Sequence, residues 1–211
     1  MSVQKRYPLW RATLSFANKI ERPCYWMGEV AAWLFVPLVL IILFDAVSRR
    51  YLRKLWFVVE NDWHFFFNSP AMQDAEWHLH TMIFLLALGY AFAMNAHIRL
   101  DIFRPRFGAR GRLAVEFLGG LFLLIPFVAI FAYNGYLYFE SAWVHNEGYG
   151  ESNGIGFRWF IKSFILIGPS LLFLAGVSIV LRLLVRIFGP EGLAEETGTK
   201  QISDPSFSAF D

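Results

Sequence analysis

Residues 26–47 read WMGEVAAWLFVPLVLIILFDAV and contain only two acidic or basic side chains, Glu29 and Asp45. A bilayer core about 30 Å thick is crossed by about 20 apolar helical residues, so this run predicts a transmembrane helix. The stretch is apolar on all faces, which is typical of a helix surrounded by lipid or by other helices. The run therefore indicates an integral membrane protein.

Three further stretches share this length and character, residues 77–96, 116–139 and 159–181. The sequence therefore predicts an all-α integral membrane protein built as a four-helix bundle. We expect residues 1–188 to form a single transmembrane domain. Residues 189–211, GPEGLAEETGTKQISDPSFSAFD, are polar and lack periodicity, so they predict a disordered tail.

The composition of the whole chain agrees with this class. Of 211 residues, 56% are hydrophobic and only 17% are charged, whereas a soluble domain carries roughly 25% charged residues. This argues against a soluble enzyme, a disordered chain and a fibrous repeat. The net charge of +2 is too balanced for a nucleic-acid-binding protein. The single cysteine, Cys24, forms no internal disulfide.

Residues 51–71, between the first two predicted spans, have a different pattern. Leu52, Leu55, Trp56 and Val59 recur at helical spacing, which favours an amphipathic helix lying flat at the membrane interface. We expect Trp56 and Trp63 to anchor it in the headgroup region.

The distribution of Lys and Arg predicts the orientation, because these residues are in excess in cytoplasmic loops. The N-terminal arm, the loop after residue 96 and the tail after residue 181 hold most of them. Both termini are therefore expected in the cytoplasm. A cluster on the predicted outer side, Arg49, Arg50, Arg53 and Lys54, disagrees with this count. Whether it binds lipid or a partner is left open.

Ionisable residues within or beside membrane spans are costly, so each needs a partner or a function. Asp45 and Arg49 are four residues apart and predict a pair along one helix face. Glu76 and Lys162 lie at similar predicted depth and have opposite charge, which suggests an interhelical pair. We interpret these charges, with Arg158, as groups that fix helix packing. A path for an ion or proton is the alternative.

Histidines raise a second alternative, a haem or metal site formed by His78, His80 and His145 near the predicted outer surface. The spacing in E-W-H-L-H is not a standard zinc motif, so we expect no metal and no cofactor. The sequence also lacks a phosphate-binding loop and a nucleophile elbow, which predicts that the chain is not an enzyme. Without internal repeats or broken helices, it is typical of an accessory subunit more than of a stand-alone transporter or channel.

Residues 73–101, QDAEWHLHTMIFLLALGYAFAMNAHIRLD, resemble the second-helix signature of one membrane family. That family is the small permease subunit of tripartite ATP-independent periplasmic (TRAP) transporters. The matching positions include an acidic residue that opens the helix, a glycine within it and a charged end: Glu76, Gly89, His97, Arg99 and Asp101. The pair Arg49 and Arg50 and the segment GFRWFIKSFILIG at 156–168 also look similar.

The resemblance implies a sodium-coupled importer of organic acids in a bacterial inner membrane. In this family a periplasmic solute-binding protein captures the substrate and a large permease subunit moves it. The small subunit would then be a non-catalytic scaffold whose partners are these two proteins and membrane lipids. As structural or subunit-interface residues we expect the following: Asp45, Arg49, Glu76, His80, His97, Arg99, Asp101, Arg158 and Lys162. The alternative is a haem-binding or other membrane-anchor subunit of a redox complex.

Overall fold

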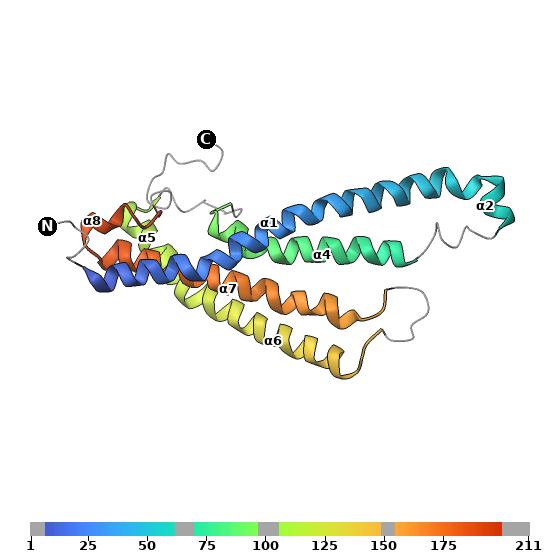
Figure 1. Cartoon of the computed structure of the whole chain (residues 1–211). Coiled ribbons are helices and arrows are strands. Elements are labelled where there is room, and N and C mark those ends of the chain that lie inside the picture. The colour runs from blue at the N-terminus through green and yellow to red at the C-terminus, as the bar shows by residue number, and fades with distance from the viewer. Residues whose placement is uncertain (1–6, 62–69, 97–105, 149–154, 200–211) are drawn as a thin grey trace. The chain divides into compact units, whose positions relative to one another are not determined.

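The computed structural model describes residues 7–61, 70–96, 106–148 and 155–199, and it is all-α. In chain order the helices are α1 (Pro8–Arg50), α2 (Trp56–Glu60), α4 (Pro70–Ala93), α5 (Ala109–Gly119), α6 (Ile125–Val144), α7 (Arg158–Phe188) and α8 (Glu191–Ala194) (Figure 1). A short 3₁₀ turn, η2 (Leu52–Lys54), precedes α2, and a π-helical segment, η4 (Gly120–Leu124), joins α5 to α6.

Three of these helical stretches are long and apolar enough to cross a membrane: Pro8–Arg50, Ala109–Val144 and Arg158–Phe188. They contain three of the four predicted spans, and each is longer than its apolar run because helix continues into polar flanks. The 24-residue α4 is not among them. Its first turns carry Asp74, Glu76, His78 and His80, which lower its mean hydropathy.

The segment between the first two predicted spans differs from the single helix expected over residues 51–71. Between positions 51 and 61 the chain forms only η2 and the five-residue α2. The next described helix, α4, begins at Pro70. Proline suits the first turn of a helix because its missing N–H would have no intrahelical partner there. Trp63 lies outside the described residues.

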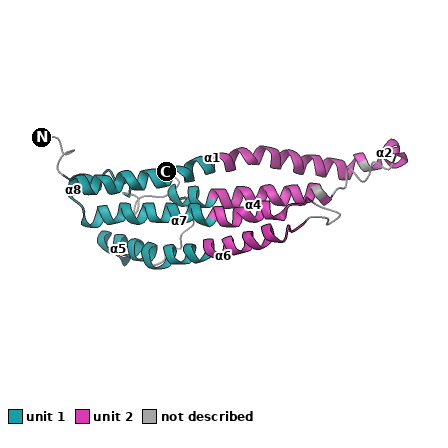
Figure 2. Cartoon of the chain, turned by 60° about the horizontal axis from the view of Figure 1, so that its bottom comes forward, with its two compact units in different colours: residues 1–27, 88–131, 169–211 teal, residues 28–87, 132–168 magenta. Residues whose placement is uncertain are grey.

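The chain divides into two compact units, residues 1–27, 88–131 and 169–211 (unit 1) and residues 28–87 and 132–168 (unit 2), coloured separately in Figure 2. Helices α1, α4, α6 and α7 each contribute a segment to both units.

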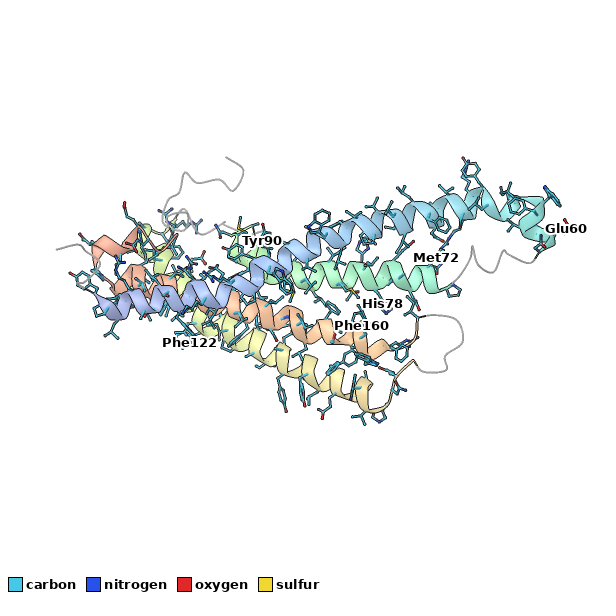
Figure 3. All side chains as sticks on the ribbon, in the orientation of Figure 1. Glu60, Met72, His78, Tyr90, Phe122 and Phe160 are labelled. Carbon is cyan, nitrogen blue, oxygen red and sulfur yellow. The ribbon has the colours of Figure 1, made fainter. Side chains whose placement is uncertain are left out.

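In unit 1, α7 packs against α1 and α4 through small side chains and backbone. Ser178 Oγ donates to the Ala17 carbonyl oxygen over 3.2 Å, and the buried Cys24 Sγ donates to the Leu171 carbonyl oxygen over 3.3 Å. A Cβ at Gly89 would lie 2.8 Å from Leu171 Cβ, so glycine permits the contact between α4 and α7. Tyr90, labelled in Figure 3, meets Tyr25 edge-on with ring centroids 6.0 Å apart.

In unit 2, α7 again has close backbone neighbours. A Cβ at Gly135 of α6 would lie 2.7 Å from the Ile165 carbonyl oxygen, and a Cβ at Gly168 would lie 2.9 Å from the Leu85 carbonyl oxygen of α4. Such approaches are typical of membrane helices, where dispersion contacts between closely packed backbones replace the hydrophobic effect. Helix α7 is thus a shared neighbour of α4 and α6 in this unit.

The C-terminal segment after α7 packs onto unit 1 at its first described residues. Residues 191–194 form α8, and Leu193 is fully buried in a cluster with Leu14 and Val185. The apolar side chain of Leu193 gives this otherwise polar segment something to bury, which outweighs the lack of periodicity around it. Residues 200–211 lie outside the described residues.

Candidate functional site

A buried charge cluster in unit 1 centres on Arg182 of α7. Its Nη2 pairs with Oε2 of Glu21 and also donates to Asn18 Oδ1 over 2.8 Å. Its Nε donates to Ser178 Oγ over 3.3 Å, and its Nη1 to the Thr197 carbonyl oxygen over 3.2 Å. The Glu21 side chain is only 3% exposed, so the Arg182 guanidinium, and not water, stabilises its negative charge. We call these five residues the Arg182 cluster.

The C-terminal segment closes over this cluster. Arg186 Nη1 donates to the Ala194 carbonyl oxygen over 2.6 Å, and Arg11 pairs with Glu196 at 3.3 Å. The backbone then turns through Gly198 at φ +68°, a conformation that glycine adopts without strain. A cavity of about 260 Å³ lies beside the turn, with Glu21 and Arg182 among its lining residues.

The Arg182 cluster was not predicted from the sequence, although residue spacing on α1 and on α7 pointed to it. The buried positions Leu14, Ala17, Glu21 and Cys24 alternate at spacings of three and four, which places Glu21 on the packed face of α1. On α7, Ser178 and Arg182 are four residues apart and share one face.

In unit 2, Asp45 and Arg49 form the pair that their spacing predicts. The Nε and Nη2 atoms of Arg49 approach the two carboxylate oxygens of Asp45 at 3.0 and 2.7 Å. With its amide oxygen turned toward Arg49, Gln73 accepts from Nη1 at 3.2 Å and from Nη2 at 2.5 Å. The next residue, Asp74, accepts the backbone N–H of Ile155 over 3.0 Å. The start of α4 is thereby tied both to α1 and to the α6–α7 connection.

Lys162 forms an ion pair with Glu147. The predicted pair between Lys162 and Glu76 is not found among the described residues. Lys162 Nζ also lies 3.9 Å from the ring centroid of Tyr138, a cation–π contact. The backbone after α6 explains this partner choice, because Gly148 has φ +85° and the Arg158 N–H donates to the Glu147 carbonyl oxygen over 3.1 Å. These turns return Glu147 to the first turns of α7.

Arg158 takes part in this turn through its backbone N–H. Trp143 of α6 and Trp159 of α7 pack edge to face beside it, with ring centroids 4.7 Å apart. Trp56, an expected membrane anchor, is 75% exposed on α2.

Two of the histidines considered for a haem or metal site bond to their own helices. His78 Nδ1 donates to the Asp74 carbonyl oxygen over 2.5 Å, and His145 Nδ1 donates to the Ser141 carbonyl oxygen over 2.8 Å. Among the residues with described positions, no group of three His, Cys, Asp or Glu side chains is placed to hold a metal ion. His97, Arg99 and Asp101 lie outside the described residues.

A groove runs between α1 and α4 in unit 2, where the two helices diverge toward α2 (Figure 1). Its volume is about 610 Å³, and we call it the α1–α4 groove. Glu76 is half-buried in its wall and His80 is exposed there. The apolar part of the wall includes Ile42, Trp77, Phe84 and Leu85.

The three long apolar helical stretches define the class as a multi-pass, α-helical membrane protein. Residues 63–186 match the family model described as "Tripartite ATP-independent periplasmic transporters, DctQ component". The match covers more than half of the chain, so the chain belongs to this family, the small permease component of TRAP transporters. No curated protein sequence and no solved structure matches the chain.

Membership has three direct consequences. The chain is a transporter component of a non-catalytic family and is not an enzyme. It is one part of a tripartite system. As a TRAP component with several candidate spans, it belongs in the inner membrane.

Proposed function

We propose that the chain is a four-span scaffold that braces the large permease subunit of a sodium-coupled importer for organic acids. A periplasmic solute-binding protein would deliver the substrate. The coupling ion and the substrate would bind to those partners and not to this chain. Family membership supports the tripartite arrangement.

The observation that carries the scaffold role is the absence of Asp, Glu, Lys, Arg and His from the central part of each long helix. Residues 30–44, 81–93, 117–139 and 163–181 contain none of these residues. A path for a carboxylate solute and its counter-ion needs polar or charged groups near the bilayer midplane. Helices with apolar central parts, packed closely at glycine residues, would instead serve as a stationary support for the large permease subunit.

We infer that α4 is the fourth span. A helix of 24 residues is about 36 Å long at 1.5 Å per residue, enough to cross the hydrocarbon core. Its charged and histidine residues gather in its first turns, so only that end needs polar surroundings. With four spans both termini lie on the same side of the membrane, and the excess of Lys and Arg on that side favours the cytoplasm. Trp56 then lies near the outer interface, where it anchors the segment that contains α2.

Co-expression with the large permease subunit of the same transporter tests the scaffold role. We expect the two subunits to purify together, and uptake into proteoliposomes to require both of them, the binding protein and a sodium gradient. Equal uptake by the large subunit alone would refute the scaffold role. Fusions of green fluorescent protein and of alkaline phosphatase to the C-terminus test the topology. Only the fluorescent protein should be active, and an active phosphatase would reverse the assigned orientation.

A further inference from the structure

The α1–α4 groove has a wall with a regular helical pattern. The lining positions on α4 are Glu76, Trp77, His80, Thr81, Phe84 and Leu85, which recur at spacings of three and four. This spacing is one continuous stripe along a helix. Trp77 and Phe84 are 74% and 65% exposed, so both large rings project from the stripe without cover from the described residues. The described part of the chain therefore leaves this stripe of α4 uncovered.

The polar side chains of the stripe indicate what kind of molecule occupies the α1–α4 groove. Glu76 and His80 are four residues apart on one face of α4, and neither makes an ion pair or side-chain hydrogen bond within the described residues. In hydrocarbon an ionisable side chain needs a partner of opposite charge or a hydrogen-bond donor. A lipid acyl chain would match the aromatic rings but would leave the carboxylate without a partner.

From this charge and shape pattern we propose that the α1–α4 groove receives a transmembrane helix of the large permease subunit. That helix places apolar side chains against Ile42 and Phe84 and presents a cation or a hydrogen-bond donor to Glu76. The inference rests on the proposed function, since it names the surface through which the scaffold holds its partner. Neighbouring helices pack with axes 8–10 Å apart, so a helix seated on the stripe covers Trp77 and Phe84 together.

Photo-crosslinking of the intact complex tests this placement with a matched control. The photoreactive residue p-benzoylphenylalanine replaces Phe84 in the groove or Phe127 on α6, which have similar exposures of 65% and 67%. We expect irradiation of the first variant to join the two subunits. We also expect the adduct at position 127 to be at least about fivefold weaker. Only lipid adducts at position 84, in a complex that still purifies intact, would overturn the proposal.

Charge variants test the polar contact separately. Glu76→Lys removes a charge-assisted hydrogen bond and adds a like charge, so we expect at least about a tenfold loss of co-purified large subunit. Glu76→Gln keeps a hydrogen-bonding group and should lose less. Glu140→Lys, at an exposed carboxylate on α6, is the control and should retain the complex. Each variant must elute from size exclusion as a single peak before its complex is scored.

The results separate this inference from the proposed function. If the wild-type chain never co-purifies with the large subunit, the scaffold role itself fails. If the complex forms and both Glu76→Lys and the position 84 variant behave as the controls do, only the groove assignment fails. A selective crosslink at position 84 together with selective loss for Glu76→Lys supports the groove as the docking surface.

Discussion

Replacement of Arg182 by methionine should strongly destabilise unit 1. The substitution keeps most of the apolar stem but removes the guanidinium that pairs with Glu21 and bonds to Asn18, Ser178 and the Thr197 carbonyl oxygen. The Glu21 side chain is 3% exposed, so water cannot replace the lost partner without structural change.

The expected magnitude follows from this burial. Removal of one partner from a buried ion pair costs about 3–5 kcal/mol, because the remaining charge is left uncompensated. At about 2–4 °C per kcal/mol for a chain of this size, the unfolding midpoint should fall by about 6–20 °C. The double variant Glu21→Leu with Arg182→Met removes both charges, and it should recover most of the loss.

Cys24 provides the assay, because it is the only cysteine and is fully buried in unit 1. A thiol-reactive dye will label it only when this unit opens, so labelling against temperature in detergent gives the midpoint. The control Arg22→Met changes an exposed arginine on the same helix as Cys24 and should shift stability by no more than about 0.5 kcal/mol. An unchanged midpoint for Arg182→Met, or a double variant less stable than either single variant, would refute the reasoning.

Two further predictions test the helix contacts and the C-terminal segment by thermal unfolding in detergent. Gly135→Ala should cost about 1–3 kcal/mol, because its Cβ would lie 2.7 Å from the Ile165 carbonyl oxygen. Gly119→Ala, where a Cβ meets no atom within 4 Å, is its control, and equal effects would count against a close contact. Leu193→Ala should cost about 2–5 kcal/mol if α8 is packed. Leu123→Ala, at a side chain 73% exposed, should cost far less, and a neutral result at Leu193 would indicate an unpacked tail.

The sequence was sufficient for the features that depend on local pattern. Apolar length is enough to identify a span, which is why three predicted spans fall within the long apolar helices. The Asp45–Arg49 pair was also predictable, since both residues lie one turn apart on the same helix. The family resemblance drawn from residues 73–101 is confirmed by the match over residues 63–186.

Features that depend on loop geometry or on distant parts of the chain were not predictable in this way. Lys162 bonds to Glu147 because positive φ angles at Asn146 and Gly148 turn the chain after α6, and hydropathy does not encode such angles. Arg182 and Glu21 are 161 residues apart, so only the packed helices bring them together. Helix ends were also missed, because hydropathy marks the apolar part of α1 and not its polar first turns from Pro8.

The π-helical segment η4 affects how mutational data from this part of the chain should be read. The Ile125 N–H bonds to the Gly120 carbonyl oxygen, five residues back, so the segment accommodates one residue more than a regular turn. Each residue of an α-helix advances about 100° around its axis. A solvent-accessibility scan with single cysteines from Ala109 to Val144 should therefore give two oscillations that are out of phase. An ungapped comparison of faces across this segment would therefore be in error by about 100° around the helix axis.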